Sequence, residues 1–565
     1  MASNPKPAIG SRVCIIGTGV LGLLALKNLK EQGLEVTALE RNDYLGGNWH
    51  VSEKIDQVTA TTLTTANISK HTNCFTDFPF ADDVELHPSA RSIENYLESY
   101  AKHFGLVSHI HFGTKVDQFE RDEVTGKWKV STQTISDNEL SPVECQEFDR
   151  IVMATGMLNK KNTVSFPGQD RFIGEIIHSR EFKDPYRYTG KNILVVGIGA
   201  TGVDTTTFLK KAGAARIYLS HRGQTYLMPK MTDGKAFDHS LSRRLGNILR
   251  FCLSWWPQGG LALMAKSMHR AQMKAYPWLA EHPSFSKPRA APTAPMIHRL
   301  PVFSDDLAYN LRDGSVQSVM GVREISGGRS VTFTDGTVVD DLDCIVICSG
   351  YHYSFSLVAG AGNPIDPTKA PDQYREIRAA PHFEENNPFS RLYHGFISEQ
   401  YPESLAFLGH VVAFSPSFVF YDLITMALAN IWGGNAPLPT AKEMRQDIDA
   451  HYRFITSALK NDRVPHPGIR VDVRNTYDWL NKMAGTGVTE RLGNFNAEAW
   501  NLWWSDRRFY NLLMDGVNVP AVYRLFDTNR GRVPWPGARS QIEKTNREVQ
   551  EMEEAWKKQN SGKGK

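Results

Sequence analysis

One local pattern occurs twice in this chain and limits what the chain can fold into. In each copy a short apolar run leads into three glycines spaced GxGxxG, an apolar helical repeat follows, and a second apolar run ends the unit. The first glycine permits a tight turn, the second lets the backbone approach a pyrophosphate, and the third lets the helix pack on the strand. Both copies therefore predict Rossmann-like units that bind a dinucleotide at a helix N-terminus. The glycines are Gly17, Gly19 and Gly22 in the first copy, and Gly197, Gly199 and Gly202 in the second.

The residue that follows the second apolar run differs between the two copies. Glu40 stands there in the first copy, where a carboxylate accepts hydrogen bonds from a ribose 2′-hydroxyl. The second copy ends in Ser220, His221 and Arg222. A guanidinium binds a 2′-phosphate that a carboxylate would repel. We therefore expect two cofactors, FAD in the first unit and NADPH in the second, with a solvated surface arginine as the alternative interpretation of Arg222.

The chain is too long for one hydrophobic core, at 565 residues, and its average share of apolar and charged residues excludes disordered and coiled-coil classes. Two similar phrases, 149–156 and 343–350, each run from Asp through apolar residues to Gly, and we interpret them as the crossings out of and back into the first domain. We expect an α/β fold with two Rossmann-like dinucleotide-binding domains, the NADPH-binding domain inserted in the FAD-binding domain. The expected bounds are 1–168 and 343–440 for the FAD-binding domain, 169–342 for the NADPH-binding domain with an insertion at 223–301, and 441–565 for a mainly helical C-terminal region.

Charge and cysteine content exclude several other functions. The formal net charge of +3 gives no general attraction to nucleic acid. The six cysteines are too sparse for a disulfide scaffold and show no CxxC spacing, which disfavours a zinc site and a dithiol redox site. We expect no metal and a reducing, cytoplasmic compartment. Without a dithiol near the flavin, O2 is the obvious acceptor for electrons that arrive from NADPH.

No window holds the ~20 uninterrupted apolar residues that a membrane-spanning helix needs. The most apolar stretch, 248–265, contains Arg250 and is broken by Pro257 and a glycine pair. We expect a buried or loop-rich insertion here. The alternative is an interfacial patch that touches a membrane surface or a lipophilic substrate. Peripheral membrane contact and oligomeric state stay open.

A longer motif precedes the second glycine loop and carries a family resemblance. Residues 172–183 fit the pattern FxGxxxHxxx(F/Y)K. With the phrases at 40–49, 64–80, 332–337, 405–410, 523–525 and 535–539, this motif resembles the flavin-containing monooxygenases over nearly the whole chain. Their Baeyer–Villiger relatives typically carry tryptophan where this chain has phenylalanine near the end of the motif. The motif residues are Phe172, Gly174, His178, Phe182 and Lys183.

The resemblance implies a mechanism and a set of site residues. Proteins of this family reduce FAD with NADPH, form a C4a-hydroperoxyflavin with O2, and oxygenate a nitrogen or sulfur nucleophile of a small organic substrate. Asn67 matches the family's active-site asparagine, whose neutral amide donates and accepts hydrogen bonds without titrating. We expect Gly46, Gly47 and Trp49 to line the flavin, although Trp49 also suits a plain core position. We expect His178 to organise the hinge between domains or to be an ordinary structural histidine.

Departures from the family pattern leave two rival functions. Residues 424–426 read Ile-Thr-Met where the animal enzymes carry Gln-Ala-Arg, so the local pocket and the substrate are not set by the resemblance. One rival is a Baeyer–Villiger monooxygenase acting on a ketone, which Phe182 and Lys183 disfavour. The other is an NADPH oxidase or reductase that oxygenates nothing. A turn or cap asparagine is the structural alternative for Asn67.

Overall fold

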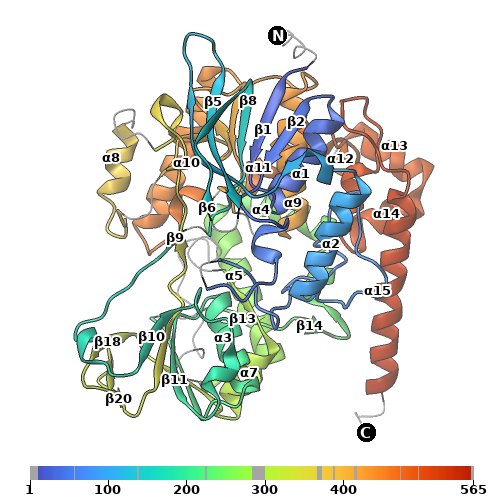
Figure 1. Cartoon of the computed structure of the whole chain (residues 1–565). Helices are drawn as coiled ribbons and strands as arrows, with labels where there is room; N and C mark the ends of the chain where they lie inside the picture. Colours follow the sequence, from blue (N-terminus) through green and yellow to red (C-terminus); the bar gives the residue numbers. More distant parts are fainter. Residues whose placement is uncertain are drawn as a thin grey trace.

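Two mainly parallel sheets, each built on one of the glycine patterns, organise the chain (Figure 1). The computed structural model describes residues 10–561 except 56, 137–138, 159, 223–224, 283–284, 286–299, 366–371, 386–388, 413–415, 471–472 and 494–495. The first sheet lies in the upper part of Figure 1 and the second in the lower part. The expected α/β fold with two Rossmann-like units and a helical C-terminal region is confirmed.

The first sheet has seven strands and contains the first glycine unit. The run from Arg12 forms β1, the glycine turn leads into α1, and the next apolar run forms β2 parallel to β1. Residues of α1 are buried on most sides because α9 covers the face that α1 turns away from the sheet. The strand order is β23 (Leu392–Tyr393), β24 (Ile397–Ser398), β25 (Leu405–Phe407), β8 (Arg150–Met153), β1 (Arg12–Ile16), β2 (Glu35–Leu39) and β3 (Ile110–His111), with helices α1 (Val20–Glu31), α2 (Ala90–His103) and α9 (Ser417–Trp432).

The second sheet repeats this arrangement with five parallel strands. The order is β10 (Glu175–His178), β21 (Cys344–Ile347), β11 (Asn192–Val196), β12 (Arg216–Ser220) and β17 (Val316–Val319), with α3 (Ala200–Lys211) and α7 (Asp305–Arg312). The expected boundary between residues 342 and 343 differs from the structure, since β21 pairs with β10 and β11 inside the second sheet. The two Asp-to-Gly phrases resemble each other because β8 and β21 take the same place, each beside the first strand of its own glycine unit.

Smaller sheets, most of them antiparallel, flank the two large ones. One consists of β4 (Thr114–Arg121), β5 (Trp128–Ser136), β6 (Glu139–Leu140) and β7 (Glu144–Phe148), and another of β18 (Val322–Ile325), β19 (Val331–Phe333) and β20 (Val338–Val339). The two-stranded pairs are β13 (Leu227–Met228) with β16 (Val302–Phe303), β14 (Met231–Thr232) with β15 (Lys235–Ala236), and β22 (Tyr351–His352) with β9 (Lys160–Lys161). The last pair joins the two crossings between the domains.

The inserted segment is helical where a buried or loop-rich stretch was expected. It forms α4 (Arg243–Trp255) and α5 (Pro257–Ala275), and its first half carries the short 3-10 helix η5 (Phe237–Ser240). Pro257 stops α4 but starts α5, because proline is tolerated in the first turn of a helix. Several large apolar side chains of these helices are exposed rather than buried. Among the helices described, none combines the length and the apolar character that crossing a membrane requires.

The C-terminal region packs against the first domain and reaches the insertion. It consists of α10 (Ala441–Leu459), α11 (Val473–Met483), α12 (Val488–Leu492), α13 (Ala497–Ser505), α14 (Arg507–Asp515), the 3-10 helix η10 (Pro520–Arg524) and α15 (Ala538–Asn560), after the shorter α8 (Asp372–Arg378). Helix α11 contacts α9, α14 contacts α4, and α15 contacts β15. In Figure 1 α15 runs down the right side of the molecule.

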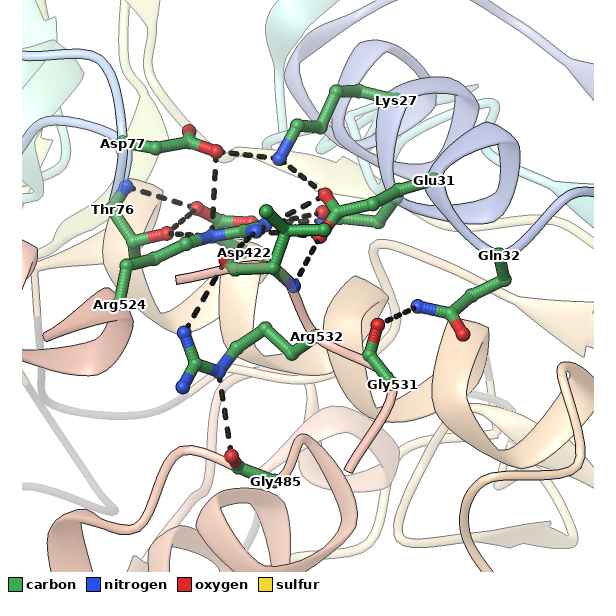
Figure 2. A network of polar contacts seen from close by, with 12 residues as sticks. Lys27, Glu31, Gln32, Thr76, Asp77, Asp422, Gly485, Arg524, Gly531 and Arg532 are labelled. Carbon is green, nitrogen blue, oxygen red and sulfur yellow. Dashed lines mark hydrogen bonds and ion pairs between the residues drawn. The ribbon is translucent and has the colours of Figure 1, made fainter. Parts of the chain in front are cut away.

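A buried network of charges fixes this region to α1 (Figure 2). Arg524 pairs with Glu31 and Asp77, and Lys27 pairs with the same two carboxylates. Asp422 on α9 accepts hydrogen bonds from the backbone and the hydroxyl of Thr76. Buried charges are tolerated when each has an opposite charge and hydrogen bonds. The network therefore fixes the positions of α1, the 64–80 segment, α9 and η10 relative to one another.

Candidate functional site

The first glycine loop leaves the N-terminus of α1 open. Gly17 has φ +98°, and a Cβ atom there would lie 2.8 Å from the carbonyl oxygen of Ala154. A Cβ atom on Gly22 would lie 2.0 Å from the carbonyl oxygen of Gly17, so only glycine lets the helix approach the strand. Gly19 caps α1 without a side-chain hydrogen bond. Backbone N–H groups at such an uncapped helix start attract the phosphates of a dinucleotide.

Glu40 lies buried at the end of β2, as its position in the sequence predicts. One carboxylate oxygen accepts hydrogen bonds from the backbone N–H of Thr18 at 2.8 Å and from its hydroxyl at 3.0 Å. The other oxygen accepts from the backbone and the side-chain amide of Asn42. These four bonds orient the carboxylate beside the glycine loop. Thr18 is a contributor that the glycine spacing alone does not single out.

The glycine pair at Gly46 and Gly47 lies directly against the first glycine loop. Both residues have positive φ, +99° and +57°, and the backbone N–H of Gly46 donates to the carbonyl of Thr18 at 3.0 Å. A Cβ atom on Gly47 would lie 3.1 Å from the Cα atom of Gly19. Trp49 is half-buried and meets Phe418 edge to face, so it packs against the core of the first domain. The backbone of this glycine pair, which carries no side chains, therefore lies along a second side of the first glycine loop.

The second glycine loop repeats the tight turn but ends differently. Gly197 has φ +119°, and a Cβ atom there would lie 2.6 Å from the carbonyl oxygen of Cys348. A Cβ atom on Gly202 would lie 1.8 Å from the carbonyl oxygen of Gly197, whereas Gly199 faces open space. Open space at the middle glycine leaves room for a pyrophosphate beside the N-terminus of α3.

Ser220 and Arg222 differ in their exposure after β12. The Ser220 hydroxyl is buried and donates to the carbonyl of Met320 at 2.7 Å, so it holds the next loop. Arg222 is exposed, and its stem lies over Gly321, where a Cβ atom would come within 2.8 Å of the Arg222 Cγ atom. Within the described residues no carboxylate forms an ion pair with Arg222. The guanidinium is thus available to an anion from solution, which suits a 2′-phosphate.

The motif at 172–183 forms the path between the two domains. A Cβ atom on Gly174 would lie 2.5 Å from the carbonyl oxygen of Asp343 and 2.6 Å from the Phe172 ring, so glycine is required there. Phe182 is buried and stacks on Tyr188 of the second domain, with ring centroids 5.6 Å apart. Lys183 donates to the hydroxyl of Thr59 at 2.8 Å and so connects this path to the first domain.

Both ring nitrogens of His178 hydrogen bond to the backbone of the segments that connect the two domains. Its Nε2 atom lies 3.1 Å from the carbonyl oxygen of Gly350 and donates to it, and its Nδ1 atom accepts from the backbone N–H of Arg180 at 3.1 Å. Burial lowers the pKa of His178, which favours the neutral ring that this pattern needs. Because β10 is the edge strand of the second sheet and Gly350 follows β21 in the segment that returns to the first domain, His178 ties these two segments together.

Asn67 lies in the 64–80 segment, next to the second domain. Its Oδ1 atom is buried and has no hydrogen-bond partner among the described residues. The Thr155 hydroxyl, beside the first glycine loop, is buried without a partner in the same way. Buried polar atoms in folded proteins are normally paired, so an unpaired one marks a position where a bound group can supply the partner. A cofactor between the domains fits this donor and acceptor set.

Three residues next to Asn67 were not expected from the sequence. Lys230, Asp238 and His239 come from the inserted segment, and all three hydrogen bond to residues 65–72. Their only sequence signal is their position in the insertion, because the contacts join residues more than 160 positions apart. Among the described residues, no group of three or more His, Cys, Asp or Glu side chains has the geometry of a metal site.

Comparison with known proteins identifies a matching family model and several relatives. Residues 10–365 match the family model described as flavin-binding monooxygenase-like. The monooxygenase aurF of Gibberella zeae is 33% identical over 94% of this chain and 96% of its own length. Human flavin-containing monooxygenase 2 is 30% identical over 78% of this chain and 76% of its own length. The S-allyl-L-cysteine S-oxygenase of Allium sativum has the same fold, with a TM-score of 0.59 at 17% identity over 96% of this chain and 99% of its own.

Proposed function

This chain belongs to the flavin-binding monooxygenase-like family, and we propose that it oxygenates a nitrogen or sulfur nucleophile of a small organic substrate. It is a flavin-dependent monooxygenase with FAD and NADPH as cofactors. We propose that the oxygenating species is a C4a-hydroperoxyflavin. When bound, FAD accepts a hydride from NADPH and supplies the oxygen chemistry that amino-acid side chains cannot perform. The chain itself binds and orients the cofactors and the substrate, excludes water from the site and holds hydrogen bonds in place.

The residues described above fit these two cofactors. Gly17, Gly19, Gly22 and the pair at 46–47 offer bare backbone to the FAD pyrophosphate, and Glu40 accepts hydrogen bonds from its ribose. Gly197, Gly199 and Gly202 offer the same to NADPH, and the exposed guanidinium of Arg222 binds the 2′-phosphate. Ser220 holds the loop beside Arg222 in position.

The observation that carries the proposal is the buried Oδ1 atom of Asn67, which has no partner within the described residues. A carboxamide whose oxygen has no partner among the described residues is ready to accept from a flavin or nicotinamide amide group. It does not titrate, so it brings no proton to an oxidant that water and protons would decompose. Asn67 therefore serves as the residue that orients the reacting groups, and His178, Phe182 and Lys183 hold the domains that surround it.

Product analysis with labelled oxygen separates this function from its rivals. The purified holoenzyme is supplied with NADPH, ¹⁸O₂ and one of three probes, N,N-dimethylaniline, methyl p-tolyl sulfide or cyclohexanone. We expect one ¹⁸O atom in the amine oxide or the sulfoxide. Label only in the lactone from cyclohexanone would assign a Baeyer–Villiger reaction, and peroxide without a labelled product would assign an NADPH oxidase.

We also propose that the insertion touches a membrane surface. Helix α4 and the start of α5 expose large apolar side chains, with Trp255 80% and Trp256 72% exposed. The segment 241–275 contains six Lys and Arg residues and no Asp or Glu. Exposed aromatic and aliphatic residues among cations are typical of helices that lie in the interface of an anionic bilayer. The other exposed apolar residues are Leu245, Ile248, Phe251 and Leu263.

Sedimentation with vesicles of phosphatidylcholine and phosphatidylserine tests this contact. Replacing Trp255 and Trp256 together with serine should reduce the vesicle partition constant by nearly a thousandfold, because each indole contributes about 2 kcal/mol of apolar burial and about 1.4 kcal/mol is a factor of ten. Trp504→Ser is the matched control, since Trp504 is 75% exposed on a different helix. Equal losses in both proteins would contradict a specific role of the insertion.

A further inference from the structure

The loop that carries Asn67 is held on both sides by the inserted segment of the second domain. On one side, the Nζ atom of Lys230 donates to the Thr65 hydroxyl at 3.0 Å and to the carbonyl of Ala66 at 3.3 Å. On the other side, Asp238 accepts from the backbone N–H of Ser69 at 3.3 Å and from its hydroxyl at 2.5 Å. Only Asn67 and Ile68 lie between these two attachments.

The attachment after Asn67 is fully buried. A carboxylate oxygen of Asp238 also accepts from the Thr72 hydroxyl at 2.6 Å. Ser69 is 0% exposed, Thr72 3% and Asp238 5%. A buried carboxylate is stable only if its hydrogen bonds are satisfied, and here the 69–72 segment supplies three of them. The insertion and the loop therefore depend on each other for burial.

His239 extends this attachment to the C-terminal region. Its Nε2 atom lies 3.0 Å from the Ser69 hydroxyl and 3.1 Å from the Nδ1 atom of His71. Because the Ser69 hydroxyl donates to Asp238, it accepts from His239. The Nε2 atom of His71 then faces Glu548 on α15 at 3.3 Å. One polar chain thus connects the second domain, the Asn67 loop and the last helix.

Burial sets the charge state of this chain of contacts. It lowers the pKa of His239 to about 4 and that of His71 to about 3, so both rings are neutral near pH 7. A neutral ring has one donor and one acceptor nitrogen, which matches the hydrogen bond from His239 to Ser69 and leaves the Nε2 atom of His71 as the donor nitrogen that faces Glu548.

We propose that Lys230, Asp238 and His239 are positioning residues, through which the inserted segment of the NADPH-binding domain sets the direction of the Asn67 carboxamide. In the part of the chain that the structure describes, no group hydrogen bonds to the buried Oδ1 atom of Asn67, so the backbone on either side decides where this side chain points. A group that acts on a cofactor contributes only when it is held within about 0.5 Å of its working position. What Asn67 does there rests on the proposed function, whereas the clamp itself rests on the contacts above.

Two variants loosen the clamp from opposite sides. Asp238→Asn weakens the attachment to Ser69 and Thr72, and Lys230→Met removes the donor to Thr65 and Ala66. Lys230→Arg restores a donor and serves as the rescue variant. Asp233→Asn is the matched control, because Asp233 lies in the same segment but is exposed and pairs with Lys274.

The first readout is hydrogen–deuterium exchange of the 64–72 segment in the holoenzyme, which does not depend on turnover. The second is the share of NADPH electrons recovered as hydrogen peroxide, measured together with KM for NADPH. We expect Asp238→Asn and Lys230→Met each to speed exchange in 64–72 by about tenfold, since each loses a charge-assisted hydrogen bond. We expect the peroxide share to rise at least about threefold in both variants, while KM for NADPH stays unchanged. Lys230→Arg should restore the wild-type exchange rate and peroxide share. Asp233→Asn should change neither the exchange rate nor the peroxide share.

Unchanged exchange of 64–72 in both clamp variants would overturn the inference. A second result would also overturn the inference: Asn67→Ala raises the peroxide share, but the clamp variants speed exchange of 64–72 and keep the wild-type peroxide share. The loop would then move without any effect on the fate of the NADPH electrons. If Asn67→Ala leaves the peroxide share unchanged, the role proposed for Asn67 is wrong, and the exchange data alone decide whether the clamp exists.

Discussion

The guanidinium of Arg524 lies 2.8 Å from the carboxylate of Glu31, although 493 residues separate the two in the chain. Arg524 is 1% exposed and Glu31 is on α1, the helix that starts at the first glycine loop. The pair therefore makes the C-terminal region part of the core that supports the FAD-binding loop. It also explains why a segment so distant in sequence belongs to the same folding unit as α1.

Replacing Arg524 with methionine should destabilise the holoenzyme by about 3–5 kcal/mol, since the carboxylates of Glu31 and Asp77 stay buried with one partner fewer. The free energy of unfolding is measured by urea titration of flavin fluorescence and circular dichroism. Arg530→Met is the control, because Arg530 is half-exposed and pairs with Glu490 at the surface, where we expect about 1 kcal/mol or less. Similar losses in the two variants would show that the buried network does not stabilise the fold.

Arg222→Ala should raise KM for NADPH by about 10- to 100-fold and change KM for NADH by less than about twofold. The physical reason is the loss of charge-assisted hydrogen bonds to the 2′-phosphate, which NADH lacks. Steady-state kinetics with both nucleotides give the ratio. Arg216→Ala, at the exposed start of β12, removes the same charge and should leave the ratio unchanged. An unaltered NADPH to NADH ratio in the Arg222 variant would exclude this assignment.

Asn67→Ala should increase the fraction of NADPH oxidation that ends as hydrogen peroxide by about tenfold, because a preorganised hydrogen bond to the reacting groups is lost. Flavin content should stay at the wild-type level. Peroxide and oxygenated product are measured in the same reaction mixture. Thr62→Ala, an exposed position in the same stretch, is the control. Full coupling in the Asn67 variant would remove Asn67 from the site.

Five histidines, three of them buried and two partly buried, should make the fold sensitive to mild acid. Burial lowers their pKa to between about 3 and about 4, whereas an unfolded histidine takes up a proton near pH 6.5. The unfolded chain therefore binds more protons between these values, and each such histidine costs up to about 1.4 kcal/mol of stability per pH unit as pH falls from about 6.5 toward 4. The residues are His71, His239, His394, His410 and His466.

Urea unfolding at pH 7.5, 6 and 5 measures this dependence. His410→Gln should reduce the slope of unfolding free energy against pH by about 1.4 kcal/mol per pH unit, since both ring nitrogens of His410 are buried without a partner in the described structure. Phe355→Leu removes a ring that packs on His410 but adds no titrating group, so it should lower stability equally at each pH. An equal slope in the His410 variant and the wild type would contradict the assignment.

The features that could be predicted from the sequence are those that local spacing determines. The glycine turns, the strands beside them and the position of Glu40 follow from steric limits within about 30 residues of chain. The difference between Glu40 and Arg222 was also predictable, because each residue comes just after the second strand of its own glycine unit. The helical C-terminal region was predictable as a class, because its periodic apolar pattern does not depend on the partner that it packs against.

The features that sequence did not predict depend on contacts between distant segments. The boundary at 342/343 missed β21 because an apolar strand fits either sheet equally well until its neighbours are known. The helices of the insertion were taken for a buried or loop-rich stretch, since the sequence there is apolar and is interrupted by Pro257 and a glycine pair. The contacts of Asp238 with Ser69 and of Arg524 with Glu31 join residues whose types alone name no partner.

The most direct test of the account is anaerobic reduction of the FAD-loaded protein with NADPH, followed by stopped-flow mixing with O2 in the absence of substrate. The absorbance spectrum of the flavin is recorded from milliseconds to minutes. We expect a long-lived spectrum of a C4a-hydroperoxyflavin, which decays faster in Asn67→Ala. Prompt return to oxidised flavin with stoichiometric hydrogen peroxide, in the wild type and the variant alike, would contradict a monooxygenase that protects its oxidant before the substrate arrives.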